Sequence, residues 1–363
     1  MSERTPPCLM RWAERVRGAA ADQTPLRLRG SGSKDFYGQS LAGELLDTRE
    51  YAGIVAYEPT ELVLTARCGT PLAELEAILA KSGQSLAFEP PYFAAGATLG
   101  GCVAAGLSGP RRAQAGAVRD FVLGVKMLDG NADQLTFGGQ VMKNVAGYDV
   151  PRLLAGSVGT LGLMLEISLK VLPLPVAEQS LHFELPQEKA LDWLNRWGGQ
   201  PLPISASAWC DNVLHLRLSG AAAAVSAAAQ KLGGQPLCSE AAHDFWRSLR
   251  EQTHTFFAGD APLWRVSLPS TCPVLTLPGR HLVEWGGAQR WLRGGTASVD
   301  QVIRSMAEKS GGHATLFRAN ETLKSTLGTF QPLSAPLAQI HRRLKLAFDP
   351  HGVFNPGRLY PEF

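Results

Sequence analysis

The sequence predicts an α+β protein made of two domains and a C-terminal tail. Its 363 residues are too many for one ordinary domain and enough for two hydrophobic cores. The first part is rich in glycine and in short apolar runs that favour strands, whereas the later part alternates strand-like with helix-like segments. The proline-rich run LPLP at residues 172–175 separates the two patterns. We therefore expect domains at residues 1–175 and 176–330, followed by a helix and tail at 331–363.

The composition excludes several classes of protein. Hydrophobic residues make up 45% of the chain and charged residues 18%, as in an ordinary globular protein. The formal net charge is only +3 and the basic residues are scattered, which argues against nucleic-acid binding. The start, MSERTPPCLMRWAERVRG, lacks the apolar run of a signal peptide, and no segment approaches the roughly 18 apolar residues of a membrane-spanning helix. We expect a cytoplasmic protein with no direct membrane span, in which any contact with the inner membrane is made through partner subunits.

The positions of cysteine and histidine restrict the chemistry further. The cysteines lie far apart and never form CxxC, the spacing that presents two thiolates to one metal, so we expect reduced thiols and no metal or iron–sulfur site. All eight histidines lie at or beyond His182. The first half of the chain therefore cannot supply a histidine to any site. The six cysteines are Cys8, Cys68, Cys102, Cys210, Cys238 and Cys272.

In the first domain, short apolar runs predict strands separated by turns. The segment PLAELEAILAKSG predicts one helix, with Thr70 as its cap, Pro71 in its first turn and Gly83 after its end. The order strand, helix, strand predicts a β-α-β segment within an α+β domain. The predicted strands are residues 26–29, 54–57, 61–67, 121–128 and 161–172.

In the second domain, the alternation predicts a smaller antiparallel α+β unit that caps the first domain. Near the C-terminus, LAQIHRRLKLAF predicts a helix that ends at DPHGVFNPGRLY, where prolines and glycines prevent its continuation. The predicted strands of the cap are residues 180–185, 213–218, 263–268 and 281–285, and its helices are 188–197, 221–232, 243–252 and 298–310.

The first motif with chemical meaning is RGSGSK, directly after the strand at 26–29. Its two glycines allow the backbone amides to turn inward, Ser31 and Ser33 add hydroxyl groups, and Arg29 and Lys34 add positive charge. A pyrophosphate fits such a turn. The motif is neither GxGxxG nor GxxxxGK[ST], so neither a Rossmann nor a P-loop site is supported. Taken alone, a glycine-serine turn after a strand is usually only a turn.

Two further glycine-rich segments follow. The first, GATLGGCVAAG at residues 96–106, continues to Gly109 and to GAVRD at 116–120. So many small residues allow either a flat ligand or a tightly packed helix to approach the backbone. The second combines KNVAGYD at 143–149 with GSVGTLG at 156–162 before a strand, and can place backbone groups beside a ligand ring.

The order and spacing of the three motifs resemble the FAD-binding domain of the vanillyl-alcohol oxidase and p-cresol methylhydroxylase superfamily. The matching segments are RGSGSK, ATLGGCVAAGLSG, KNVAGYDVPRLLAGSVGTLG and, in the tail, LAFDPHGVFNPGRL. The resemblance covers residues 26–175 and the tail. It implies a two-subdomain FAD-binding domain, a tail that returns to that domain, and FAD as cofactor. The implied FAD-binding residues are Arg29, Gly30, Ser31, Gly32, Ser33, Lys34, Pro91, Gly96, Ala97, Thr98, Gly100, Gly101, Gly106, Gly109, Asp120, Gly162 and Ile167.

Within this superfamily, RGSGSKDFYG and PPYFAAGATLGGCVAAGLSGPRR resemble segments of the FAD-binding subunits of bacterial glycolate oxidases. The resemblance implies a subunit of a multi-subunit 2-hydroxyacid dehydrogenase that oxidises glycolate to glyoxylate and passes the electrons to a partner. The implied partners are a larger catalytic flavoprotein subunit and an iron–sulfur subunit.

Two departures from the superfamily pattern matter. Relatives that bind flavin covalently carry a histidine in the first loop, where this chain has Ser33, so the resemblance implies non-covalent FAD. Catalytic hydroxyacid dehydrogenases carry an HxGDGN-like motif in the second domain. At roughly the equivalent place this chain reads GHATLFR, which contains His313 and Arg318 but lacks the aspartate and asparagine of the motif. These two residues are weak candidates for a base and a carboxylate clamp. A self-sufficient FAD oxidoreductase and a scaffold without turnover remain alternatives to the subunit.

Overall fold

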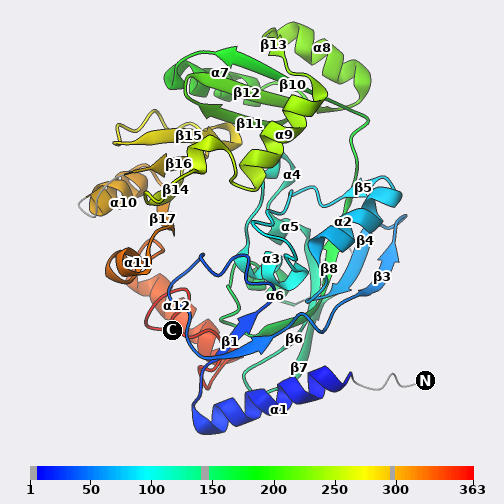
Figure 1. Ribbon diagram of the computed structural model, residues 1–363, viewed down its shortest axis with the longest axis vertical. Helices are drawn as coiled ribbons and strands as arrows, with labels where there is room; N and C mark the ends of the chain where they lie inside the picture. Colours follow the sequence, from blue (N-terminus) through cyan, green and yellow to red (C-terminus); the bar gives the residue numbers. More distant parts are fainter. Residues whose placement is uncertain (1–5, 140–146, 295–298) are drawn as a thin grey trace.

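The computed structural model of the protein describes residues 6–139, 147–294 and 299–363. Two large sheets lie one above the other along the long axis of the molecule (Figure 1). The lower sheet has the order β3-β4-β8-β6-β7 and is antiparallel throughout. Its strands are β3 (Ile54–Glu58), β4 (Val63–Arg67), β8 (Leu163–Lys170), β6 (Val122–Leu128) and β7 (Gln134–Gly138).

The central strand β8 is covered on both faces because its side chains alternate between two apolar clusters. Met164 packs in the cluster that contains Leu75 of α2 (Leu72–Lys81). Leu163 and Leu165 pack in a second cluster, which contains Trp12 of α1 (Pro7–Asp22). The lower sheet is therefore an internal layer between helices, although the sequence pattern had not indicated α1.

Glycine-rich segments connect this sheet to short helices and to a separate parallel pair, β1 (Leu26–Arg29) and β2 (Glu44–Asp47). The segment after β5 (Gln84–Ser85) leads into α3 (Leu99–Ala105), which Thr98 caps by accepting a hydrogen bond from Gly101 N at 3.3 Å. The small residues of this segment thus form a helix, which is one of the two interpretations that the sequence allowed; the other was the close approach of a flat ligand. The remaining short elements are α4 (Arg112–Ala115), α5 (Val118–Phe121), α6 (Val150–Leu154) and β9 (Leu172–Pro173).

The upper sheet is an eight-stranded antiparallel layer with the order β13-β10-β12-β11-β15-β16-β14-β17. Its strands are β10 (Ala177–Glu184), β11 (Ile204–Cys210), β12 (Val213–Gly220), β13 (Gln235–Pro236), β14 (Leu263–Ser267), β15 (Arg280–Glu284), β16 (Gln289–Arg293) and β17 (His313–Arg318). The helices between them are α7 (Gln187–Gly198), α8 (Ala222–Leu232), α9 (Ser239–Arg250) and α10 (Asp300–Lys309). We propose that the two sheets mark two domains that meet near residue 175.

The cap at the start of α2 differs from the prediction. Thr70 does not cap the helix: Pro71 occupies the cap position, and the Thr70 hydroxyl instead donates to Arg67 O at 2.7 Å and accepts from Gly53 N at 2.9 Å. The hydroxyl therefore closes the turn between β4 and the helix, because that turn offers it nearer backbone partners.

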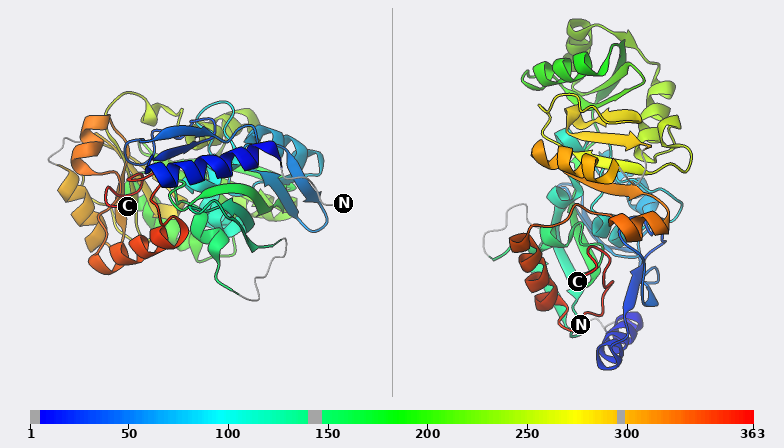
Figure 2. Two further views of the ribbon diagram at one scale, coloured as in Figure 1. Left: turned by 90° about the horizontal axis from the view of Figure 1, so that it is seen from below. Right: turned by 90° about the vertical axis from the view of Figure 1, so that its left-hand side faces the viewer.

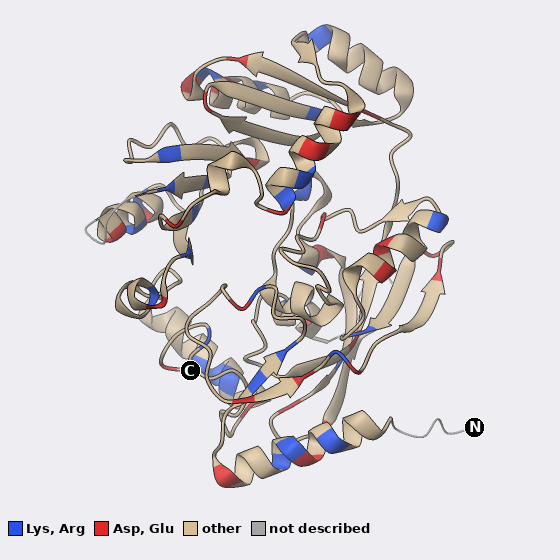
Figure 3. Ribbon diagram, in the orientation of Figure 1, with Lys and Arg blue, Asp and Glu red and all other residues tan. Residues whose placement is uncertain are grey.

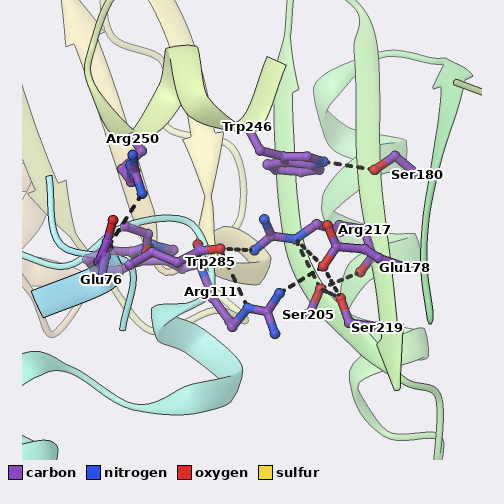
Figure 4. Close-up of polar contacts among 12 residues, drawn as sticks. Glu76, Arg111, Glu178, Ser180, Ser205, Arg217, Ser219, Trp246, Arg250 and Trp285 are labelled. Atoms are coloured by element: carbon purple, nitrogen blue, oxygen red, sulfur yellow. Dashed lines mark hydrogen bonds and ion pairs between the residues drawn. The ribbon is translucent and has the colours of Figure 1, made fainter. Parts of the chain in front are cut away.

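The two domains are joined by a partly buried ionic network, in which Arg217 is the most deeply buried member (Figure 4). Glu89, in the segment after β5, forms an ion pair with Arg217 of β12 at 2.8 Å and lies 3.5 Å from Arg111. Arg111 in turn contacts Glu178 of β10 at 2.8 Å. Arg217 is only 4% exposed and stacks over Trp246 of α9. Because buried charges are costly unless they are paired, this network holds the upper sheet in one position against the glycine-rich segments.

After the upper sheet, α11 (Glu321–Leu327) and α12 (Ala335–Phe348) carry the chain back to the lower domain, and the C-terminus lies at the same end of the molecule as α1 (Figure 2). Asp349 is buried and accepts from Lys345 Nζ at 2.6 Å, from Val353 N at 3.0 Å and from Phe354 N at 2.8 Å. Lys345 also donates to Thr160 O at 2.8 Å. The tail is thereby fixed to the segment before β8.

Lys and Arg are spread over both domains and do not form one stripe (Figure 3). None of the described helices is both long and apolar enough to cross a bilayer.

Replacing Asp349 with Asn should destabilise the protein by about 3 to 5 kcal/mol, because it leaves the Lys345 ammonium buried without its counter-charge. The matched control is Asp192→Asn, which breaks an exposed i,i+4 pair with Arg196 and should cost less than about 1 kcal/mol. Urea denaturation followed by circular dichroism measures both. Equal losses in the two variants would contradict the proposed anchoring role of Asp349.

Candidate functional site

The turn after β1 and the helix α3 enclose a groove of about 550 Å³. A second hollow of about 380 Å³ adjoins it and reaches the start of β8. The two cavities share part of their walls. The shared residues come from β1, α3, the segment before β8 and the C-terminal tail. These shared residues are Leu28, Arg29, Gly30, Gly101, Ala104, Val158 and Asn355.

The groove exists because two backbones approach each other without side chains between them. A Cβ placed on Gly30 would lie 2.2 Å from Oγ1 of Thr98, a distance that real Cβ contacts do not reach. Gly32 has a φ of +80°, which side chains disfavour. Any larger residue at Gly30 would push the turn away from α3. The two glycines of RGSGSK therefore bring that turn against the ATLGG segment.

The charge of the groove is predominantly positive. Arg29 pairs with Asp35 at 2.9 Å, and Arg27 pairs with the same carboxylate at 3.0 Å. Lys34 donates to Tyr92 O at 3.4 Å, and burial lowers the pKa of its ammonium. Arg358, from the tail, also lines the groove and donates to Asp35 O at 2.6 Å. Asp35 is the one acidic residue of this lining among the described residues, against three cationic ones.

The backbone of the turn offers free donors. The N–H groups of Ser31 and Gly32 have no acceptor within the part of the chain that the structure describes. Amide donors beside Arg29 and Lys34 match the oxygen atoms of a pyrophosphate, which accept several hydrogen bonds and carry negative charge. The residues present therefore fit a dinucleotide.

The C-terminal tail completes the wall of the groove. Asn355 accepts from Leu28 N at 2.8 Å and donates to Val158 O at 2.7 Å, so that it connects β1 to the segment before β8. The candidate residues had not included Asn355 or Arg358. Their signal in the sequence was the NPGR stretch of the tail.

The structure brings together most of the residues predicted to bind cofactor. The residues that line the groove or the adjoining hollow are Arg29, Gly30, Ser31, Gly32, Ser33, Lys34, Thr98, Gly100, Gly101 and Gly162. Others lie elsewhere: Gly106 lines a cleft between the domains, and Pro91 and Gly109 line a pocket beneath the upper sheet. Four predicted residues line none of these cavities, namely Gly96, Ala97, Asp120 and Ile167. Residues 143–146 of the third motif lie outside the described residues.

Asp120 and Ile167 have local structural partners. The Asp120 carboxylate accepts from Ala117 N at 2.8 Å and so caps α5. The Ile167 side chain is fully buried in the core of the lower sheet. Gly96 and Ala97 precede α3, and Gly96 lies beside Ser31.

A cleft of about 1220 Å³ lies between the two domains at the other end of α3. Gly106 and Gly156 form part of its floor, continuing the two segments that wall the groove. His313 lines this cleft but Arg318 does not: Arg318 stacks on Phe36, 3.7 Å from the ring centroid. The two weak catalytic candidates are therefore not brought to one cavity, and Arg265 of β14 lies beside His313 instead.

The pocket beneath the upper sheet contains an unusual carboxyl group. Glu284 is 4% exposed, and its Oε2 accepts from Trp291 Nε1 at 2.6 Å and from Gln289 Nε2 at 3.1 Å. Burial raises the pKa of Glu284 to about 7. No role can be assigned to Glu284 from the sequence, because its burial depends on the packing of β15 against β16.

Comparisons with known proteins agree with this geometry. A family model for the FAD binding domain matches residues 11–149. Glycolate oxidase subunit GlcE of Escherichia coli (strain K12) is 50% identical over 349 residues, which cover 96% of each chain. Glycolate oxidase subunit GlcD of Bacillus subtilis (strain 168) is 32% identical over 162 residues, 44% of this chain and 34% of that protein. A solved structure of alkyldihydroxyacetonephosphate synthase matches 95% of this chain and 74% of its own, with a TM-score of 0.63 at 15% identity.

The fold is that of a p-cresol-methylhydroxylase-type FAD-binding domain, and together with the relatives it defines a FAD-dependent oxidoreductase. The predicted fold class and cofactor are thus confirmed. Because half of its residues are identical to GlcE over almost the whole length, the chain belongs to the family of the glycolate oxidase subunit GlcE.

The carboxyl group of Glu284 predicts a pH dependence of stability. Its ordinary pKa is 4.5 and its pKa in the folded protein is about 7, so unfolding releases a proton between these values and stability falls as the pH rises. The Glu284→Gln variant has no carboxyl group to ionise, and the amide oxygen of the glutamine can still accept from Trp291. The free energy of unfolding of the variant minus that of wild type should therefore rise by roughly 3 kcal/mol from about pH 5 to about pH 8.

Urea denaturation at several pH values measures this difference. Glu184→Gln, a substitution of an exposed carboxylate on β10, should follow the wild-type curve. If the stability of Glu284→Gln depended on pH in the same way as that of wild type, the carboxyl group of Glu284 would have its ordinary pKa.

Proposed function

We propose that this chain is the FAD-binding subunit of a multi-subunit oxidase that converts glycolate, or a closely related 2-hydroxyacid, to its 2-oxoacid. The groove carries this proposal, since free amides, Arg29 and Lys34 meet there beside the side-chain-free backbones of Gly30, Gly32 and Gly101. Its relatives GlcE and GlcD are both named as subunits of glycolate oxidase. When bound, FAD accepts two electrons from a substrate and passes them on.

The residues divide into two sets by position. Residues 29–34 would hold the pyrophosphate, because they supply the unpaired amides and the positive charge. Thr98, Gly101 and Gly162 would line the rest of the dinucleotide, with Asn355 closing the wall. The FAD-binding domain at residues 1–175 would supply no histidine for covalent attachment, because no histidine precedes His182 in the sequence.

The partners would be a larger catalytic flavoprotein subunit and an iron–sulfur subunit. All six cysteines are free, and the described residues contain no group of three or more His, Cys, Asp and Glu side chains that could hold a metal ion. Electrons leaving the flavin would therefore pass to cofactors of other subunits. Contact with the inner membrane, in this proposal, is made through those subunits.

The chain purified by itself should show a flavin absorption spectrum, and acid precipitation should leave FAD in a yellow supernatant. The double variant Gly32→Val/Gly101→Val should lose at least tenfold in FAD affinity, because the new side chains enter the groove and force the turn from its φ of +80°. Fluorescence titration of flavin-free protein with FAD measures the affinity.

The matched control is Gly18→Val/Gly139→Val, since a Cβ at either position meets nothing within 4 Å. It should bind FAD as wild type does. A wild-type chain that is folded by circular dichroism yet shows no saturable FAD uptake would overturn the proposed function.

The isolated chain, assayed with glycolate, D-lactate and an artificial electron acceptor, should turn over at less than about a hundredth of the rate of the reconstituted complex. The reason is that, among the described residues that line the cleft, none beside His313 is an acid that could orient it as a base. Comparable rates for the chain and the complex would favour the self-sufficient enzyme. Activity in a complex containing flavin-free chain would favour the scaffold.

A further inference from the structure

The segment EPPYF, residues 89–93 of the lower domain, ends in a strained residue. Phe93 has a φ of +59°, in the left-handed region that bulky side chains rarely adopt. Such a conformation persists only where surrounding contacts hold it. The two prolines of the segment have no N–H to contribute. The contacts of the Tyr92 and Phe93 N–H groups therefore decide how this end of the segment is held.

A single carboxylate of the upper domain binds both N–H groups. Glu251 directly follows α9, and its Oε2 accepts from Tyr92 N at 2.9 Å and from Phe93 N at 2.8 Å. Its other carboxylate oxygen accepts from Arg250 Nε at 2.8 Å. The Glu251 side chain is only 18% exposed, and hydrogen bonds to a charged acceptor are stronger than those between neutral groups. The upper domain thus holds the strained end of a segment that belongs to the lower one.

The same end of the segment contacts the RGSGSK turn of the groove. Lys34 Nζ donates to Tyr92 O at 3.4 Å and lies over the Phe93 ring, 5.6 Å from its centroid. Burial lowers the pKa of the Lys34 ammonium, while Cys102 and then Glu251 oppose that shift. The Glu251 carboxylate is therefore near enough to act on the ammonium directly as well as through the backbone of Tyr92.

The other contacts of Tyr92 hold its side chain instead of its backbone. The Tyr92 hydroxyl donates to Glu76 Oε2 at 2.7 Å, and Arg250 lies 5.3 Å from the centroid of the Tyr92 ring. Figure 4 shows Arg250 directed toward Glu76, with 3.9 Å between Nη1 and Oε1. Within the part of the chain that the structure describes, Glu251 is the residue that binds the N–H groups of Tyr92 and Phe93.

We propose that Glu251 is a positioning residue of the FAD site, which fixes the Tyr92–Phe93 backbone and through it places the Lys34 ammonium for the pyrophosphate. The inference rests on the proposed function, because it takes Lys34, which lines the groove, as a ligand of FAD. Since Glu251 belongs to the upper domain, the dinucleotide site of the lower domain is complete only when the two domains are joined. Sequence distance hides this dependence, because 217 positions separate Lys34 from Glu251.

Fluorescence titration of the flavin-free full chain with FAD tests the inference. Glu251→Ala should weaken FAD binding by about tenfold, because it releases two charge-assisted hydrogen bonds and with them the carbonyl that holds Lys34. Glu251→Gln should lose only about threefold, since its amide oxygen still accepts from the same N–H groups but carries no charge. If Glu251→Ala fails to fold, as judged by circular dichroism, Glu251→Gln carries the test.

A second background separates positioning from a general structural effect. In a chain that already carries Lys34→Met, Glu251→Ala and Glu251→Gln should each change FAD affinity by less than about twofold, because residues that act through one contact are not additive. The matched control is Glu240→Ala, which removes an exposed carboxylate from the other end of α9 and should bind FAD within about twofold of wild type.

The outcomes distinguish the inference from the proposed function. Wild-type chain without saturable FAD uptake would overturn the proposed function and this inference with it. Wild-type affinity in both Glu251 variants would overturn the inference alone. The same loss with and without Lys34→Met, or an equal loss in Glu240→Ala, would show that Glu251 only stabilises the fold, and would also overturn it.

Discussion

The close approach of Gly30 to Thr98 is the contact on which the rest of the site depends. It sets the turn after β1 against the start of α3, and the groove is the space that these two backbones leave between them. A side chain at Gly30 would have to displace Thr98, whose hydroxyl caps α3. Because α3 also carries Gly106 at its far end, a shift of this helix would alter the interdomain cleft as well. The absence of a side chain at Gly30 therefore affects both the groove and the interdomain cleft.

The second constraint is the ionic network at Glu89, which fixes how the upper sheet faces those cavities. Glu89 follows β5 in the lower domain, whereas Arg217 lies on β12 of the upper one. Both are shielded from water, so either charge alone would be unfavourable. The hydrogen bond from Trp285 Nε1 to Gly109 O, at 3.1 Å, ties the same interface near the cleft. Glu89 and Glu178 are used in these contacts. Among the described residues of the cleft, Arg119 pairs with Asp120 at 3.9 Å, whereas Arg112 and Arg265 make no ion pair.

The groove and the cleft present their positive charge in different ways. In the groove, Arg29 is already paired with Asp35, and the unpaired backbone amides of Ser31 and Gly32 provide additional donors for an extended anion such as a pyrophosphate. In the cleft, the guanidinium groups of Arg112 and Arg265 lie over aromatic rings, and Arg265 also donates to the Tyr37 hydroxyl at 3.3 Å. The two ends of α3 thus face two cavities whose linings carry positive charge in different ways.

The sequence by itself determined the fold class and the turn at 29–34, because these depend on local properties: glycine where the backbone must bend and apolar periodicity in strands and helices. The cofactor followed from the resemblance of its motifs to a known family. The sequence could not determine that Asn355 and Arg358 join the groove beside a turn more than 300 positions earlier, nor that Arg265 and not Arg318 lines a cavity with His313. Those facts follow from the strand register of β14 with β17 and from the return of the tail. The burial of Glu284 and the acid-free lining of the cleft have the same origin, since solvent exclusion and the sum of charges around a cavity arise only when distant segments pack together.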